Sequence, residues 1–285
     1  MGNTKYTYAV ARIRALETSL LTNAAIEQLL ACPTAEQALQ LLIEKGWGDT
    51  AAGNDMDAVL NREEEKTWQV IRDVAPDMSV FDVLSYPKLY HNLKAAIKEV
   101  CTEVRNPHIF YDDCSITGEE MLKIVENKDF SRLPGNMPGV AQEAFETLLH
   151  TRDGQLCDIM VDKAALEAVR DAGRRSGEPI IDDYADTTVA IADIKIAVRS
   201  QKTGKSSDFM RSAMAECRGV SVEQLIRAAL SGVDEIAQYL EGTSYAGGAD
   251  ALKESPSAFE RWSDNRMLET LKPQKDETPS IPPGL

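Results

Sequence analysis

The stretch Asn92-Leu93-Lys94-Ala95-Ala96-Ile97-Lys98 is matched, 101 positions later, by Asp193-Ile194-Lys195-Ile196-Ala197-Val198-Arg199. The lysine and the second alanine are identical, and the other five positions exchange residues of the same class. A second similarity pairs Glu27-Gln28-Leu29-Leu30 with Glu223-Gln224-Leu225-Ile226, and a similar apolar segment follows each of them. Two matches within one chain predict internal duplication, which is typical of proteins built from repeated units.

Both copies of the seven-residue pattern are expected to be helical. The second copy, taken alone, alternates apolar and polar residues over 194–199, which is the period of a half-buried strand. In the first copy, however, Leu93, Ala96 and Ile97 fall on one face of a helix, and alanine favours that conformation. Because duplicated segments share a fold, the first copy decides the prediction for both.

The rest of the chain also has the pattern of helices joined by short connections. Apolar residues spaced three and four apart predict an amphipathic helix between Tyr6 and Leu20, and Pro33 ends a second, short helix. Thr34, Thr117 and Ser221 are each followed, three residues later, by Glu or Gln, which is the capping box of a helix start. The predicted fold class is all-α, with further helices at about 35–45, 55–74, 88–104, 139–150, 163–173, 180–201, 207–217, 233–241 and 257–271.

Composition restricts the class of partner. The 31 lysines and arginines against 46 aspartates and glutamates give a net charge of −15, which repels phosphate backbones and argues against a nucleic-acid partner. No apolar run reaches the roughly 18 residues that span a bilayer, and the start of the chain lacks the apolar core of a signal peptide. The five scattered cysteines form no CxxC pair and are expected to be reduced, mostly structural thiols. A soluble, cytoplasmic protein is predicted.

Motifs for chemistry are weak, and we predict no catalytic, cofactor-binding or metal-binding residue. Lys202-Thr203-Gly204-Lys205-Ser206 ends like a phosphate-binding P-loop, but Arg199 stands where that motif needs a glycine, so we interpret it as a helix end capped by Gly204. The three histidines are too far apart in sequence to indicate a metal site. They are His91, His108 and His150.

Acidic runs could supply paired carboxylates for acid–base chemistry. In a chain this acidic, a solvated face or a helix N-terminus is the favoured interpretation. The runs are Asp112-Asp113, Asp182-Asp183 and Glu63-Glu64-Glu65. Tryptophans within helical patterns are expected to belong to the core, and these are Trp47, Trp68 and Trp262.

A series of short segments, in order along the chain, carries a family resemblance. The first is a predicted helix with the sequence Ala-Arg-Ile-Arg-Ala-Leu-Glu, which ends at Glu17 and is preceded by a tyrosine-rich segment. The later segments are Leu21-Thr22, Tyr90-His91-Asn92-Leu93-Lys94, Phe130-Ser131-Arg132-Leu133-Pro134, Val161-Asp162-Lys163-Ala164 before Tyr184, Asp193-Ile194-Lys195 with Arg199, and Phe259-Glu260-Arg261-Trp262-Ser263-Asp264-Asn265. Together, over about residues 5 to 272, they resemble the C subunit of the V/A-type rotary ATPases, which is called the d subunit in the eukaryotic vacuolar enzyme.

The resemblance implies a funnel-like bundle of three similar helical units around a pseudo-threefold axis. We place these units at 1–110, 111–217 and 218–271, followed by a proline-rich tail, 272–285, that is expected to be extended or disordered. In this family another long helix, with a third copy of the repeated pattern, follows the position of Leu271. The third unit is therefore expected to be incomplete.

The resemblance also implies a function without catalysis. Members of the family sit on the cytoplasmic end of the membrane rotor ring as a peripheral component, one copy per complex, and receive the foot of the central stalk. They couple the stalk to the ring during ATP synthesis or ATP-driven transport of protons or sodium ions. Two alternatives stay open: a free-standing acidic helical repeat adaptor that binds a protein or peptide in a groove, and a hydrolase that uses one of the aspartate pairs.

Four residues of the repeated pattern are candidates for polar contacts between units: Asn92, Lys94, Asp193 and Lys195. The alternative is that they lie on a solvated helix surface. Equivalent buried hydrogen bonds in both copies would favour the contact, and full exposure in either copy would favour the surface.

Overall fold

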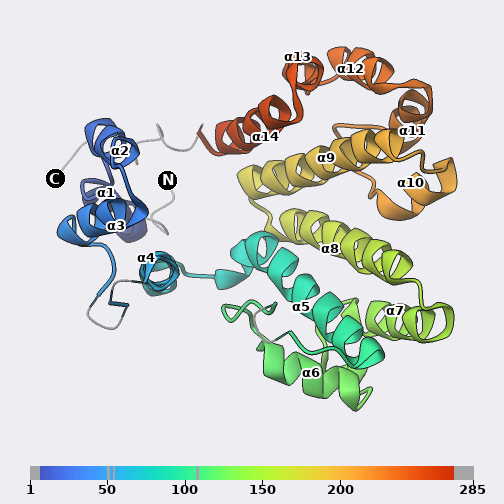
Figure 1. Cartoon of the computed structure of the whole chain (residues 1–285), viewed down its shortest axis with the longest axis horizontal. Coiled ribbons are helices and arrows are strands. Elements are labelled where there is room, and N and C mark those ends of the chain that lie inside the picture. Colours follow the sequence, from blue (N-terminus) through green and yellow to red (C-terminus); the bar gives the residue numbers. More distant parts are fainter. Residues whose placement is uncertain (1–6, 50–51, 54, 107–108, 273–285) are drawn as a thin grey trace. The chain divides into compact units, whose positions relative to one another are not determined.

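The computed structural model describes residues 7–49, 52–53, 55–106 and 109–272, and the regular structure in that part of the chain is helical (Figure 1). The all-α prediction is confirmed. The predicted tail lies outside the described residues except for Lys272. The helices are α1 (Thr7–Glu17), α2 (Asn23–Leu30), α3 (Ala35–Glu44), α4 (Met56–Val74), α5 (Asp82–Thr102), α6 (Gly118–Glu126), α7 (Met137–Thr151), α8 (Gly154–Ser176), α9 (Pro179–Lys202), α10 (Ser207–Ala213), α11 (Val222–Ser231), α12 (Val233–Glu241), α13 (Ala246–Glu254) and α14 (Pro256–Leu271), with 3₁₀ turns at Met78–Phe81 and Phe130–Arg132.

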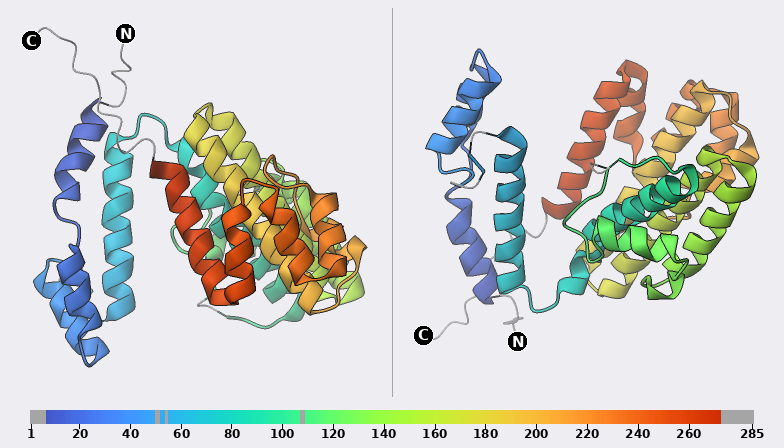
Figure 2. Two further views of the ribbon diagram at one scale, coloured as in Figure 1. Left: turned by 90° about the horizontal axis from the view of Figure 1, so that it is seen from above. Right: turned by 60° about the horizontal axis from the view of Figure 1, so that its bottom comes forward.

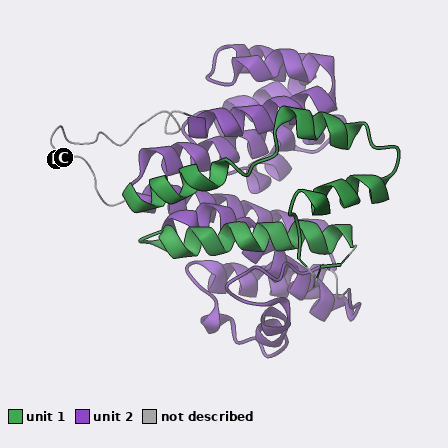
Figure 3. Ribbon diagram, turned by 90° about the vertical axis from the view of Figure 1, so that its left-hand side faces the viewer, with its two compact units in different colours: residues 1–78, 278–285 green, residues 79–277 purple. Residues whose placement is uncertain are grey.

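The chain divides into two compact units (Figure 3). Compact unit 1 comprises residues 1–78 and 278–285, and compact unit 2 comprises residues 79–277. The boundaries of the three helical units that we placed after residues 110 and 217 both fall in connections, one between α5 and α6 and the other between α10 and α11. Those three units remain a prediction.

Compact unit 1 contains α1 to α4 and has a thin apolar core. Its buried apolar side chains are few and mostly small or medium in size: Ala9, Ala25, Leu39, Leu42 and Val59. Polar contacts add to the packing. Arg12 of α1 donates to Asp73 of α4 at 3.0 Å. The Gly48 N–H donates to Glu63 of α4 at 2.7 Å, which holds the connection before α4 against that helix.

Compact unit 2 is built on four long helices. They lie side by side in the order α5, α8, α9, α14, so that each contacts the next (Figures 1 and 2). The shorter helices α6 and α7 pack on α5, and α7 also contacts α8. Helices α10, α11 and α12 pack on α9, and α13 packs on α14. The repeated pattern lies in α5 and α9, so both copies are helices, as predicted. The strand-like alternation of the second copy does not correspond to a strand.

Two apolar clusters within compact unit 2 correspond to the two copies. One cluster joins α5 to α6, α7 and α8 and includes the fully buried Leu93, Ala96 and Ile97. The other joins α9 to α10 through α14 and includes the fully buried Ile194 and Ala197. At about 25 cal/mol per Å² of buried apolar surface, such side chains supply most of the stabilisation that holds the long helices together.

Helices α8 and α9 pack closely because of one glycine. A Cβ atom added at Gly173 of α8 would lie 2.5 Å from the Cβ of Ala185 of α9 and 3.2 Å from the Cα of Asp182. Gly177, with φ of +68°, then ends α8 in the left-handed conformation that favours glycine, and Pro179 occupies the first turn of α9. A sharp reversal therefore joins two helices that touch backbone to backbone.

None of the helices in the described part of the chain combines the length and the apolar character needed to cross a membrane.

Candidate functional site

The four candidate residues lie on two of the long helices of compact unit 2. Asn92 and Lys94 belong to α5, whereas Asp193 and Lys195 belong to α9. Asn92 and Asp193 are completely buried, and the two lysines are partly exposed, with 21% of the Lys94 side chain and 35% of the Lys195 side chain accessible. In each copy, therefore, a buried polar group and a partly exposed cation lie two residues apart.

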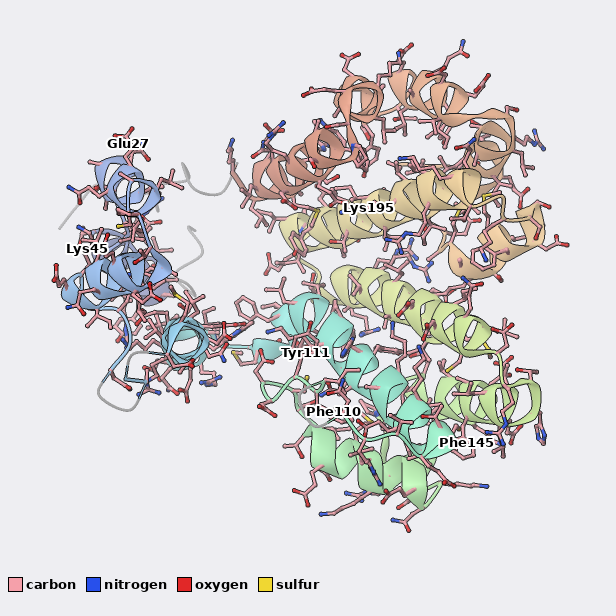
Figure 4. All side chains as sticks on the ribbon, viewed as in Figure 1. Glu27, Lys45, Phe110, Tyr111, Phe145 and Lys195 are labelled. Carbon is pink, nitrogen blue, oxygen red and sulfur yellow. The ribbon has the colours of Figure 1, made fainter. Side chains whose placement is uncertain are left out.

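The buried residue of each copy binds the backbone of a nonhelical segment further along the chain, between α5 and α6 for Asn92 and between α10 and α11 for Asp193. Asn92 Oδ1 accepts from the Tyr111 N–H at 2.9 Å, and Asn92 Nδ2 donates to the Tyr111 carbonyl oxygen at 2.8 Å. Asp193 Oδ1 accepts from the Ala215 N–H at 3.1 Å. Figure 4 shows Tyr111 in the segment beside α5. Both buried residues thus accept a hydrogen bond from a backbone N–H, and Asn92 also donates one.

The cation of each copy binds a carboxylate on the neighbouring long helix. Lys94 Nζ contacts Asp162 of α8 at 2.6 Å, and Lys195, which Figure 4 places on α9, forms an ion pair with Glu260 of α14. We call Asn92 and Lys94 with Tyr111 and Asp162 the first clasp. We call the corresponding set on α9, with Ala215 and Glu260, the second clasp. Each clasp joins one long helix both to the next long helix and to a nonhelical segment later in the chain.

The clasps bear directly on the two interpretations of these residues. No member of the four is fully exposed, and the two buried members each accept a hydrogen bond from a backbone N–H, which favours structural contacts over a solvated surface. With the predicted boundary after residue 110, Asn92 and Lys94 both bind residues of the following helical unit. With the boundary after residue 217, Lys195 does so, whereas Asp193 binds Ala215 of its own unit. The assignment to contacts between units stays a prediction because the boundaries themselves are predicted.

The partners of the clasps were not predicted, although the sequence held a signal for two of them. Asp162 and Glu260 both lie inside segments that carried the family resemblance, and both are acidic residues that follow an apolar one. Nothing in the sequence pointed to Tyr111 or Ala215, because they contribute only backbone atoms.

Arg218 is a further charged residue that sequence reasoning missed. Its guanidinium contacts Asp182 at 2.6 Å, Asp183 at 3.1 Å and Asp186 at 3.4 Å. Asp182 lies in the first turn of α9, in agreement with the helix N-terminus interpretation, and Arg218 binds both aspartates of the pair. The other pair differs in its partner, since Asp113 forms an ion pair with Lys88.

The P-loop-like segment is a helix end. Gly204 has φ of +64°, and the Lys205 N–H donates to the Ser200 carbonyl oxygen of α9 at 2.9 Å. Ser206 then caps α10 by accepting from the Phe209 N–H at 3.2 Å. Because the Lys205 N–H satisfies the end of α9, it does not point at an anion.

The thiols and possible metal ligands have a structural character. Burial raises the pKa of Cys114, Cys157 and Cys217 to about 11 each, which keeps them protonated and poorly nucleophilic at neutral pH. Within the described residues, no three His, Cys, Asp or Glu side chains converge as ligands for a metal ion. His108 lies outside the described residues.

Comparison with known proteins connects this geometry to a family. The model of the ATP synthase (C/AC39) subunit family matches residues 9–283, which is nearly the whole chain. The chain belongs to the ATP synthase (C/AC39) subunit family. It is therefore, by family, a C subunit of the V/A-type ATPases, and the resemblance carried by its segments is confirmed.

Two curated relatives of this family are similar along most of their length. The C subunit of the V-type sodium ATPase of Enterococcus hirae is 20% identical over 237 residues, which cover 82% of this chain and 72% of the relative. The C subunit of the A-type ATP synthase of Methanocaldococcus jannaschii is 23% identical over 297 aligned positions, which cover 94% of this chain and 74% of the relative. Membership in the ATP synthase (C/AC39) subunit family implies a place in a rotary ATPase complex.

Proposed function

We propose that this protein is a non-catalytic central-rotor subunit that couples the soluble central stalk to the membrane rotor ring of a V/A-type ATPase. The observation that carries the proposal is the match of the family model to residues 9–283. Coupling of this kind transmits torque in either direction, from ion flow to ATP synthesis or from ATP hydrolysis to ion transport. The finer features proposed with it are a funnel-like arrangement of three helical units, a single copy per complex, and a peripheral position on the cytoplasmic face of the membrane.

The packing of compact unit 2 suits a part that must carry torque. Close-packed protein interiors have low compressibility and transmit strain. In compact unit 2 the long helices are held by two apolar clusters, by the contact at Gly173 and by the two clasps. A body built in this way resists shear between its helices better than helices joined by surface contacts alone.

The charge of the chain suits basic partner surfaces. The net charge of −15 attracts a basic surface at long range, which speeds and orients the encounter more than it tightens the final complex. Assembly with the stalk or the ring should therefore slow as ionic strength rises, because salt screens exposed charges beyond roughly 10 Å at 0.1 M.

Depletion of the protein from a cell that carries the complete ATPase tests the coupling. We expect membrane vesicles from depleted cells to lose ATP-driven ion transport, while the soluble ATPase subunits continue to hydrolyse ATP. Re-addition of the full chain should restore transport. If transport persists at the normal rate in vesicles shown to lack the protein, the coupling role is wrong.

Fractionation separates the rotor role from the adaptor alternative. A rotor subunit pellets with membranes and leaves them together with the soluble ATPase subunits when the complex is dissociated. A free-standing adaptor stays in the soluble fraction at every step. Recovery of the chain alone in the soluble fraction, from cells whose ATPase is intact, would favour the adaptor.

A further inference from the structure

The two clasps differ chemically at their buried position. Asn92 is an amide, which donates through Nδ2 and accepts through Oδ1, and it makes both hydrogen bonds to Tyr111. Asp193 occupies the same place on α9, but an ionised carboxylate only accepts hydrogen bonds. The second clasp therefore lacks a donor unless Asp193 carries a proton.

The surroundings of Asp193 leave one of its oxygens without a partner. The residue has no solvent-exposed surface, its Oδ1 accepts from the Ala215 N–H, and its Oδ2 is buried with no hydrogen bond. A buried carboxylate with one hydrogen bond is costly in the ionised form and much less so in the neutral form. Asn92 Nδ2, the corresponding atom of the first clasp, donates to a backbone carbonyl.

Few charges are placed to stabilise an ionised Asp193. The pKa of Asp193 is raised to about 8, chiefly by burial, and Glu216, in the segment after α10, acts in the same direction. The Ala215 N–H and Lys163 of α8 oppose the shift. The thiol of Cys217 is also near, and its own pKa is raised to about 11, chiefly by burial.

Other charged groups on α9 and α10 have partners of their own. On α9 itself, Asp186 accepts from the Arg218 N–H at 2.9 Å. Arg211 of α10 binds Glu223 of α11 at 2.7 Å. No cation is therefore described within hydrogen-bonding distance of the Asp193 carboxyl, although Lys163 acts on it from further away.

We propose that Asp193 is protonated in the folded protein and that its carboxylic acid replaces the amide of Asn92, so the second clasp is complete only while this proton is bound. The hydroxyl on Oδ2 then supplies the donor that Asn92 Nδ2 supplies in the first clasp. Loss of the proton leaves a buried charge with a single donor. The segment 214–217, which is held to α9 through this contact, is the part of the molecule expected to loosen. The inference does not depend on the proposed rotor function.

The sign of the pH effect follows from the two states of the carboxyl group. In the unfolded chain Asp193 releases its proton near pH 4, whereas the folded protein keeps it to about pH 8. Between these values the folded state binds more protons than the unfolded state, so stability falls as pH rises. The contribution is complete below about pH 4, decreases up to about pH 8 and then stays constant. The equilibrium constant for folding should fall up to about tenfold per pH unit in that window.

The substitution Asp193→Asn tests this directly, because asparagine supplies the proposed donor at every pH. Urea unfolding of the full chain, from pH 5.5 to pH 8.5, is followed by fluorescence in a background in which Trp47 and Trp68 are replaced by phenylalanine. Trp262, the remaining tryptophan, packs against the cluster around α9 and α14 and reports on compact unit 2. We expect the folding constant of the aspartate protein to decline by about fiftyfold relative to the Asp193→Asn variant as pH rises from 6 to 8.

The first clasp provides the matched reverse substitution. Asn92→Asp should give the first clasp the pH dependence of the second, with the folding constant falling over the same window. The proposal is overturned if Asp193→Asn leaves the pH dependence unchanged, or if it destabilises the protein to the same extent at pH 6 and pH 8.

A second measurement keeps the test valid if Asn92→Asp does not fold. The carboxyl carbon of Asp193 is assigned by ¹³C NMR as the resonance that Asp193→Asn removes. A protonated chemical shift at pH 6 is the expected result, and an ionised shift at that pH would overturn the proposal. Hydrogen exchange of the Ala215 N–H should also accelerate above pH 8 by more than the intrinsic increase of amide exchange with pH. This excess should be absent in Asp193→Asn.

Discussion

Replacement of Gly173 by alanine should destabilise compact unit 2, although alanine is the better helix former. The new Cβ would lie 2.5 Å from the Cβ of Ala185, whereas nonbonded carbon atoms prefer roughly 3.5 to 4.0 Å. Helices α8 and α9 must therefore separate by about 1 Å, and forced overpacking of this kind costs about 1 to 3 kcal/mol. The gain in helix propensity, about 1 kcal/mol, offsets part of that loss.

Gly139 provides the control, because a Cβ atom there has no neighbour within 4 Å. It lies in the first turn of α7, and Gly139→Ala should raise the free energy of unfolding by about 0.5 kcal/mol through helix propensity alone. We therefore expect the two alanine variants to differ by about 0.5 to 2.5 kcal/mol, with Gly173→Ala the less stable. Urea denaturation with Trp262 as the single tryptophan measures this difference, provided that the slope with urea is unchanged.

A compensating substitution separates the steric argument from other effects of the mutation. Ala185→Gly removes the atom that the new Cβ would meet. Gly173→Ala should therefore cost less stability in the Ala185→Gly background than in the unchanged protein. Recovery will be incomplete, because the Cα of Asp182 stays 3.2 Å from the new Cβ. A Gly173→Ala protein as stable as the Gly139→Ala protein, or a double variant with purely additive losses, would refute the account of the α8–α9 contact.

Three further outcomes test other parts of the molecule. A double-mutant cycle on Lys94 and Asp162 should give a coupling of less than about 1 kcal/mol, because 58% of the Asp162 side chain is exposed to solvent; a coupling above about 2 kcal/mol would show a stronger contact than the geometry implies. Leu225→Ala, in the cluster around α9, should lower the free energy of unfolding by about 2 to 5 kcal/mol in urea denaturation, and a loss below about 1 kcal/mol would contradict its burial. Cys157 should react with a thiol reagent at pH 8 only on the timescale of unfolding, since burial raises its pKa to about 11, whereas rapid labelling in the folded protein would contradict this.

Helix starts were well predicted because they depend on local chemistry. Thr34, Thr117 and Ser221 each accept a hydrogen bond from the backbone N–H three residues later, at 3.3, 3.2 and 3.5 Å, so the hydroxyl half of each predicted capping box is confirmed. A cap needs only the four residues around it, and a single sequence contains all of them.

The helices that were misjudged depend on contacts distant in sequence. Helix α13 was not predicted, since Gly247 and Gly248 lower its helix propensity. Those glycines leave room for Trp262, whose ring would lie 2.8 Å from a Cβ at either position. Helix α10 was expected to reach residue 217 but ends at Ala213, and the Ala215 N–H that would have continued it binds Asp193 instead. Tertiary packing decided both cases.

At the candidate site, too, the sequence identified the residues, whereas their contacts depend on segments distant in the chain. Residue type and the duplicated pattern identified Asn92, Lys94, Asp193 and Lys195 as positions that recur, which requires no knowledge of the fold. The burial of Asn92 and Asp193, and the effect of their chemical difference, appear only when the segments that contain Tyr111 and Ala215 are placed beside α5 and α9. An amide and a carboxylate count as a conservative exchange in sequence, but in a buried site they differ by one donor.

The two types of contact in each clasp contribute differently to the structure. The ion pairs lie partly in solvent and add little free energy, so their main effect is to fix how far one long helix is shifted along the next. The buried residue adjacent to each pair is bonded to backbone, and a buried polar group left without its partner costs about 1 to 3 kcal/mol. A shift of α5 or α9 by one turn would therefore break the buried bond as well as the ion pair. The repeated pattern sets the register of the long helices through its polar residues, while the apolar residues beside them supply the cohesion.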